Sequence, residues 1–251
     1  PSLNQLVSQQ KQQTTTTSKE KELTEKLFVL LNKEEQKNYT KICSLSFGQQ
    51  RLWFLHQLEL DNSNDRICEA LQLSGELNIN ALQQALNTIV KRHEILRANF
   101  ISIDGNPMQF IRENRSLSLS IFDLSGIENE VEKEIELKRL LQQEAQKPFN
   151  LRSDLMLKAS LVKKSDRLHI LLLTAHEIVC DRYSLEIFSQ DLAASYTALV
   201  TDKPSPLEEL SIQYTDFIAW QQEQLQSEAL ETQLAYWKNK LKGKLSVLEL
   251  P

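Results

Sequence analysis

The sequence is short of glycine and of long apolar runs, and each shortage excludes a class of protein. Only five of its 251 residues are glycine, and they lie too far apart to form a phosphate-binding loop. Walker and Rossmann nucleotide-binding motifs, which need clustered glycines, are therefore absent. No uninterrupted apolar stretch approaches the roughly 20 residues of a membrane-spanning helix. We expect neither a transmembrane segment nor a membrane partner.

Cysteine is also scarce. The three cysteines, Cys43, Cys68 and Cys180, are odd in number and widely spaced, which does not suit a disulfide framework. This usage predicts a reduced, cytoplasmic location. The chain begins at Pro1, without an initiator methionine and without the basic-then-apolar pattern of a signal peptide. We expect it to be a piece of a longer polypeptide.

Basic residues are fewer than acidic ones: the chain has 29 lysines and arginines, 34 aspartates and glutamates, and a net charge of −5. A general nucleic-acid-binding protein needs a basic surface, so no nucleic acid partner is expected. Apolar residues make up 41% of the chain and charged residues 25%. This balance is that of a globular protein with a core of its own.

The first 40 residues differ in character from the rest. Residues 8–19 are polar, low in complexity and without apolar periodicity, which is typical of a linker. Leu23, Leu27 and Leu30 then recur at helical spacing, which fits either a docking helix or a linker helix. We predict a linker or docking segment, partly disordered, over residues 1–40 and a folded unit over residues 41–251.

Helix and strand patterns alternate in this unit without strict β-α-β regularity, which predicts an α+β fold with a mixed sheet flanked by helices. The strand at residues 168–174 is apolar throughout, which indicates a central strand covered on both faces. A capping box at Ser46–Gln49 predicts the start of a helix. Further strands are expected at residues 67–73, 96–101, 107–111, 117–122 and 155–162.

Four further helices are predicted from apolar residues at steps of three and four. One is capped by Asn78 or Asn80, and one covers residues 127–146 with Val131, Ile135 and Leu141 facing inward. The others cover residues 184–200 and 213–242, the last of them anchored by Tyr214, Phe217, Leu234 and Trp237 among others.

The most informative stretch is Ala175–Ser184, which joins the predicted central strand to the helix over residues 184–200. Strand-to-helix junctions often present polar side chains to a cleft. An imidazole and two carboxylates, those of His176, Glu177 and Asp181, are costly to bury unpaired. We expect them to face a cleft or tunnel, or to pair with arginine.

Three chemical interpretations of this stretch stay open. His176-Glu177-x-x-Cys180 differs by one residue from the zincin pattern, but a second histidine is missing and no histidine follows downstream, so no metal is expected. Glu177 or His176 accepts a proton in acid–base catalysis. Alternatively, His176 and Asp181 only brace the loop, Asp181 by capping the helix or by pairing with an arginine, and Cys180 is a small apolar filler.

Four stretches resemble, in order and spacing, the core motifs of the condensation domains of nonribosomal peptide synthetases. The likeness covers residues 42–251 and also includes Lys147–Leu151 and Leu248–Pro251. We interpret Trp53, Phe54, His56 and Trp220, which lie in or beside these motifs, as packing residues. The four stretches are Ser46–Leu55 (SFGQQRLWFL), Arg92–Phe100 (RHEILRANF), His176–Ser184 (HEIVCDRYS) and Tyr214–Trp220 (YTDFIAW).

The resemblance implies a chloramphenicol acetyltransferase-like lobe, one of two that enclose a tunnel. It also implies carrier-protein partners, which deliver a donor acyl thioester and an acceptor aminoacyl thioester on phosphopantetheine arms, and an amide bond as product. No cofactor is expected on the lobe itself. The chain stops where the first lobe of the family ends, so we expect an N-terminal lobe that pairs with the C-terminal lobe of the same domain and is inactive alone.

The third motif departs from the family pattern His-His-x-x-x-Asp-Gly at two positions. Aligned on Asp181, His176 is the first histidine, Glu177 replaces the second, and Arg182 replaces the glycine. The second histidine is the residue to which the family attributes help in the attack of the amine. A carboxylate, with a pKa of about 4.3, is a weak base near neutrality, so we expect impaired or altered turnover. The alternative is a catalytically silent platform that recruits a carrier protein or a tailoring enzyme.

Asp181 resembles the structural aspartate of the family, which pairs with an arginine and shapes the loop. Arg92, Arg97 and Arg51 are its candidate partners.

Overall fold

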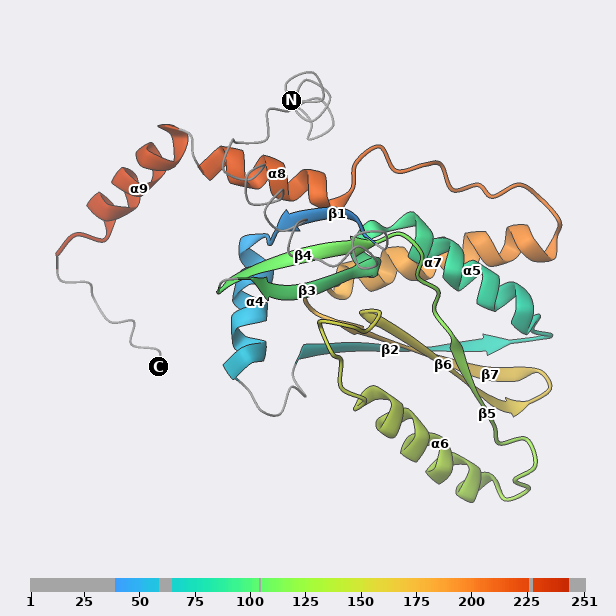
Figure 1. Ribbon diagram of the computed structural model, residues 1–251. Coiled ribbons are helices and arrows are strands. Elements are labelled where there is room, and N and C mark those ends of the chain that lie inside the picture. Colours follow the sequence, from blue (N-terminus) through green and yellow to red (C-terminus); the bar gives the residue numbers. More distant parts are fainter. Residues whose placement is uncertain (1–38, 59–64, 104, 226–227, 244–251) are drawn as a thin grey trace.

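The computed structural model describes residues 39–58, 65–103, 105–225 and 228–243 (Figure 1). The predicted linker or docking segment over residues 1–40 lies outside these ranges except for its last two residues, which begin a strand. The stretch Leu248–Pro251 also lies outside them. In the described part of the chain, no helix combines the length and the apolar character that crossing a lipid bilayer requires.

The described strands form two sheets. A three-stranded antiparallel sheet has the order β1-β4-β3, and a four-stranded sheet has the order β2-β7-β6-β5. In the second sheet β5 runs parallel to β6 and the other pairs are antiparallel, which confirms the predicted mixed sheet. The strands are β1 (Tyr39–Ser44), β2 (Arg66–Ser74), β3 (Ala98–Ile103), β4 (Asn106–Arg112), β5 (Leu119–Asp123), β6 (Leu157–Ser165) and β7 (Leu168–His176).

Helices cover both faces of the four-stranded sheet, with α5 and α7 on one side and α6 on the other (Figure 1). The 3₁₀ turn η2 (Glu94–Arg97) follows α5, and α8 lies beside β1. The α-helices are α4 (Phe47–Leu58), α5 (Ile79–Arg92), α6 (Glu130–Ala145), α7 (Arg182–Val200), α8 (Tyr214–Leu225) and α9 (Glu228–Lys240).

Strand β7 is central, as its apolar run predicts. Leu171 and Leu173 pack into the core beneath α5 and α7, whereas Ile170 packs against the α6 cluster on the other face. Alternate residues of a strand point to opposite faces, so a strand with both faces covered has no polar side. The strand thus delivers its last residue, His176, into the interior.

Two predicted helix starts are confirmed. The Gln49 N–H donates to Ser46 Oγ (3.2 Å) and the Ser46 N–H donates to Gln49 Oε1 (3.0 Å), the reciprocal pair of a capping box. Asn78 caps α5, since its Oδ1 accepts the N–H of Ala81 at 3.0 Å. Each cap satisfies main-chain donors that have no partner within the helix.

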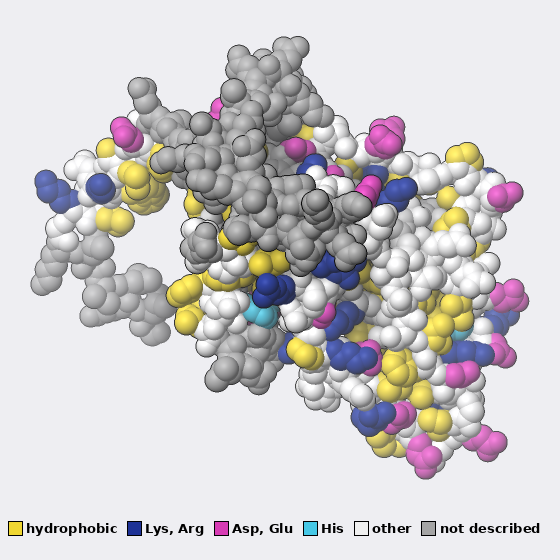
Figure 2. All heavy atoms as spheres, viewed as in Figure 1, with side chains coloured by type: hydrophobic (Ala, Val, Ile, Leu, Met, Phe, Trp, Pro, Cys, Tyr) yellow, Lys and Arg dark blue, Asp and Glu magenta, His cyan; other side chains and the backbone are white. Residues whose placement is uncertain are grey.

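The prediction of which α6 side chains face the core is wrong for two of the three residues. Val131 and Ile135 are 69% and 63% exposed, and only Leu141 of the three packs against the core. The buried stripe instead includes Lys133 and Glu144, both of which have partners. The structure has two helices, α8 and α9, where one helix was predicted over residues 213–242. Leu234 and Trp237, two of the predicted anchors, are exposed on α9. Figure 2 shows hydrophobic side chains on α9 and side chains of both charge signs on α6.

Candidate functional site

The site is built on the turn between β7 and α7. The N–H of Val179 donates to the carbonyl of His176 (3.1 Å) and closes the turn. Gln49 of α4 donates from Nε2 to the carbonyl of Ile178 at 3.1 Å. The first motif therefore braces the third, although 129 residues separate the two partners.

Asp181 caps α7. Its Oδ1 accepts the N–H of Ser184 at 2.7 Å and the Ser184 hydroxyl at 2.6 Å, while Ser184 Oγ accepts the Asp181 N–H at 3.3 Å. These hydrogen bonds hold the pKa of the Asp181 carboxyl below its usual value. Of the two roles considered for Asp181, the structure shows the cap.

The candidate arginines have other positions. Arg92 donates from Nε to Asp191 Oδ2 at 3.2 Å, and Arg97 donates to main-chain carbonyls, among them that of Val90 at 3.2 Å. Arg51 lies exposed on α4. The expected pairing of Asp181 with one of these arginines is therefore replaced by the capping box.

Arg182, in place of the family's glycine, is the first residue of α7 and has an exposed side chain. A helical backbone accepts any ordinary residue, so the local fold does not require glycine there.

His176 is fully buried, with 1% of its surface exposed. Its Nδ1 accepts the N–H of Ile178 at 3.1 Å. Burial lowers the pKa of His176 to about 4, although the nearby Asp65 carboxylate acts in the opposite direction. The imidazole is therefore neutral at pH 7 and lies out of reach of a substrate.

Glu177 faces the other way. Its side chain is exposed and lines a cavity of about 330 Å³ between η2, the start of α7 and the segment that leads to α8. The cavity walls are mainly apolar, and the polar side chains among them include those of Asp181, His93 and Gln213. The N–H of Glu177 donates to the carbonyl of Asp65 at 2.8 Å.

The cavity has an acidic character. Glu177 and Asp181 are among its lining residues, and none of the described residues that line it is lysine or arginine. Burial lowers the pKa of His93, which favours the neutral ring. Burial raises the pKa of the Cys180 thiol to about 12, so this group stays protonated and acts as the apolar filler that the sequence predicts. An apolar cavity lined by carboxylates suits an amine better than an anion.

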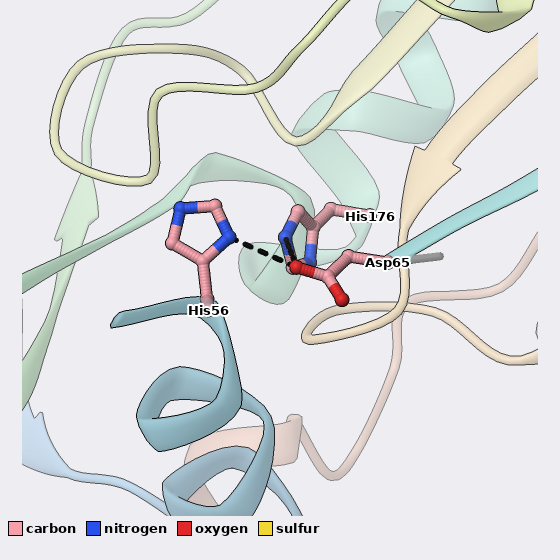
Figure 3. A group of neighbouring side chains, drawn as sticks. All are labelled: His56, Asp65 and His176. Atoms are coloured by element: carbon pink, nitrogen blue, oxygen red, sulfur yellow. Dashed lines mark hydrogen bonds and ion pairs between the residues drawn. The ribbon is translucent and has the colours of Figure 1, made fainter. Parts of the chain in front are cut away.

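The zincin-like arrangement is not formed, because His176 ends a strand and the turn places Cys180 elsewhere. A different group, His56, Asp65 and His176, brings three ligand-type atoms within 4.8 Å of one another (Figure 3). Sequence reasoning missed Asp65, which belongs to no motif.

Two residues interpreted as packing groups have other surroundings. His56 donates from Nδ1 to Asp65 Oδ2 at 2.9 Å, and Phe54 is 58% exposed on α4. Trp53 does pack, against the cluster that contains Ile178, and Trp220 lies against Phe217 with ring centroids 5.8 Å apart.

Comparison with known proteins gives consistent matches along the sequence. The family model described as condensation domain matches residues 39–251. A linear gramicidin synthase of Brevibacillus parabrevis is 41% identical over 239 residues, which cover 91% of this chain and 3% of that protein. Malpinin synthetase of Mortierella alpina is 37% identical over 207 residues, or 82% of this chain and 3% of the relative. The chain thus spans a few per cent of these relatives.

Solved structures with the same fold include the following two. The X-domain in its complex with OxyB from teicoplanin biosynthesis matches with a TM-score of 0.73 and 28% identity, over 84% of this chain and 46% of that one. The starter condensation domain of rhizomide synthetase matches with a TM-score of 0.73 and 20% identity, over 81% of this chain and 48% of that one. The family model and the relatives show that the chain belongs to the condensation-domain family of nonribosomal peptide synthetases, whose reaction is amide-bond formation.

Proposed function

We propose that residues 41–251 are the N-terminal half of a condensation domain, preceded by a linker or docking segment over residues 1–40. Its partners are the C-terminal lobe of the same domain and the donor and acceptor carrier proteins. Two observations support this. The chain covers 46% and 48% of the two solved chains described above, and α9 leaves Leu234, Tyr236 and Trp237 exposed, as expected of a helix that another lobe covers.

The reaction of the completed domain joins two carrier-bound thioesters in the cytoplasm. The acceptor amine attacks the donor carbonyl carbon, a C–N bond forms, and the C–S bond to the donor phosphopantetheine breaks. The donor arm leaves as a thiolate, and a base takes the proton of the amine and passes it to the sulfur, so that the products are an amide and a free thiol. The lobe itself holds no cofactor, because both substrates arrive on the arms of their carrier proteins.

The observation that carries this proposal is the placement of Glu177, at the position of the second motif histidine and on the wall of the acidic cavity. His176 is buried behind it and has a positioning role. A carboxylate holds an ammonium group well but removes its proton poorly near neutrality. Turnover is therefore impaired by about 10²- to 10⁴-fold relative to a histidine, with a residual rate from the proximity of tethered substrates.

The test is amide transfer in the complete condensation domain with loaded carrier proteins, followed by intact-protein mass spectrometry. Glu177→His should raise the transfer rate by about 100-fold or more. Glu186→His is the matched control, because Glu186 is an exposed carboxylate on α7 that does not line the cavity. Equal rates for the wild type and Glu177→His would contradict the proposal.

A second function, a catalytically silent platform that recruits a carrier protein or a tailoring enzyme, is supported by the likeness to an X-domain whose structure was solved with OxyB. Native mass spectrometry with neighbouring domains and candidate enzymes separates the two functions. Recruitment of such a partner without amide transfer favours the platform, and amide transfer without recruitment rejects it.

A further inference from the structure

A buried group of three titratable side chains lies directly behind the site, outside the cavity. His56 is in the last turn of α4, Asp65 precedes β2, and His176 ends β7 (Figure 3). Asp65 Oδ2 lies 2.9 Å from His56 Nδ1 and 3.7 Å from His176 Nε2. The exposed fraction of the side chain is 12% for His56, 10% for Asp65 and 1% for His176. The catalytic proposal assigns no task to His56 or Asp65.

The hydrogen bonds fix where the protons are. His176 Nδ1 accepts the N–H of Ile178, so the proton of the neutral ring is on Nε2, the atom that faces Asp65. Among the residues that the structure describes, Nε2 has no hydrogen-bond partner of its own within 3.5 Å. The Asp65 carboxylate accepts from His56 and therefore lies between two ring N–H groups.

This protonation state argues for a hydrogen-bonded network and against a cation. A metal ligated by His176 Nε2 needs the lone pair of that nitrogen and a proton on Nδ1. A proton on Nδ1 would meet the N–H of Ile178, two donors at the distance of a hydrogen bond. The three groups can satisfy one another without a metal if Asp65 and His176 approach by less than an ångström.

The network is linked directly to Glu177. The Asp65 carbonyl accepts the Glu177 N–H at 2.8 Å, while the carboxylate of the same residue faces the ring of His176. Asp65 thus contacts two consecutive residues of the turn, one through its side chain and one through its main chain. His56 ties Asp65 to α4, the helix whose Gln49 also holds the turn.

We propose that Asp65 and His56 are positioning residues for Glu177: the Asp65 carbonyl fixes the Glu177 main chain, and the His56 hydrogen bond holds Asp65 in place. The statement about turnover rests on the proposed function, whereas the statement about the geometry of the turn does not. A hydrogen bond to a charged group, once removed, changes a local opening equilibrium by about 10- to 100-fold.

The test uses the complete condensation domain and four variants. Asp65→Ala and His56→Leu remove the two members of the pair. His56→Asn keeps an N–H donor near the position of Nδ1. Glu144→Gln is the matched control, because Glu144 is a buried carboxylate on α6 that accepts from Ser160 (2.9 Å) and Lys147 (2.7 Å), neither of which belongs to the turn or to the group of three.

The first measurement is hydrogen exchange at the Glu177 amide. Asp65→Ala and His56→Leu should accelerate exchange by about tenfold or more. His56→Asn should stay within about twofold of the wild type, and Glu144→Gln should leave this amide unchanged. Unchanged exchange in Asp65→Ala would overturn the proposal, as would equal acceleration in Glu144→Gln. Stoichiometric binding of added Zn²⁺ that Asp65→Ala abolishes would also overturn it, in favour of a metal site.

The second measurement is the kinetics of amide transfer. A displaced Glu177 should lower kcat/KM for the acceptor by about 10- to 100-fold, because a small misplacement acts both on the position of the amine and on the reacting geometry. An unchanged kcat/KM in Asp65→Ala and His56→Leu would overturn the positioning role. If the wild type transfers nothing, the proposed function fails, and the exchange measurement still decides whether Asp65 and His56 hold the turn.

Discussion

At the scale of single residues, the site depends on two neighbours with opposite surroundings. His176 is the last residue of β7 and points into the protein, whereas Glu177 points into the cavity. The contrast arises where the strand ends, since His176 is the last residue of β7 and Glu177 is the first residue of the turn. Under the proposed function, the second residue of the pair acts on the acceptor amine, and in this chain a carboxylate occupies this position.

The buried imidazole predicts a pH-dependent stability. Burial lowers the pKa of His176 to about 4 in the folded protein, whereas an exposed histidine in the unfolded chain titrates near 6.5. Between these values the unfolded state binds more protons, so the free energy of unfolding falls as the pH is lowered from about 6.5 to about 4. The expected loss from this group is about 3 kcal/mol, and its contribution is complete above pH 6.5.

Urea unfolding of the wild type and His176→Asn between pH 4 and pH 8 measures this effect. Asparagine does not titrate, and its side-chain oxygen keeps an acceptor for the Ile178 N–H. The difference in unfolding free energy between the two proteins should therefore shrink as the pH is lowered. A difference that stays constant over this range would show that His176 titrates normally.

At this scale, the sequence predicts Glu177 as the reactive residue but does not indicate the residues that hold it in place. Glu177 is recognisable because it interrupts a motif of fixed spacing. Asp65 carries no such signal, since it contacts His176 only after β2 and β7 pair across more than 100 residues. The capping role of Asp181 was one of two alternatives, and only the positions of Ser184 and of the arginines decide between them.

At the scale of elements, α7 forms one wall of the cavity that Glu177 lines. Its first two turns supply Ser184, Leu185 and Phe188 to the lining, so the start of the helix must be well defined. The capping box between Asp181 and Ser184 supplies that definition.

The cap can be tested by double-mutant cycles. Asp181→Ala should destabilise the protein by about 1 kcal/mol, and its coupling with Ser184→Ala should be at least about 0.5 kcal/mol. Its coupling with Arg92→Leu should be within about 0.3 kcal/mol of zero, because the two side chains have different partners. Thermal or urea unfolding gives these values. A larger coupling with Arg92 or Arg97 than with Ser184 would restore the arginine pairing expected from the family.

Helix α6 shows why an apolar pattern alone can misplace a helix face. Its buried stripe contains Lys133, which pairs with Glu130 (2.8 Å), and Glu144, which pairs with Lys147 and accepts a hydrogen bond from Ser160. Pairing offsets part of the desolvation cost of a buried charge, so this stripe is buried while Val131 and Ile135 lie on the outside. The partners that permit this burial include Ser160 on β6, which becomes a neighbour of the helix only in the folded protein.

At the scale of the whole molecule, α9 extends beyond α8 at one end of the fold and leaves Leu234, Tyr236 and Trp237 exposed. The fold class was predictable, because one continuous apolar strand and several amphipathic helices determine a layered α+β structure. Strand β1 and the division of the C-terminal helix were not, because they depend on β4 and on contacts of α8 with α4 and β1.

The central claim is that the Glu177 carboxylate occupies the place where the acceptor amine is held. A structure of the complete condensation domain with an aminoacyl-phosphopantetheine analogue bound on the acceptor side tests it most directly. We predict the amine nitrogen within about 3 Å of a Glu177 carboxylate oxygen, in the cavity lined by η2 and α7. An amine bound elsewhere, with the Glu177 carboxylate turned away from it, would contradict the account.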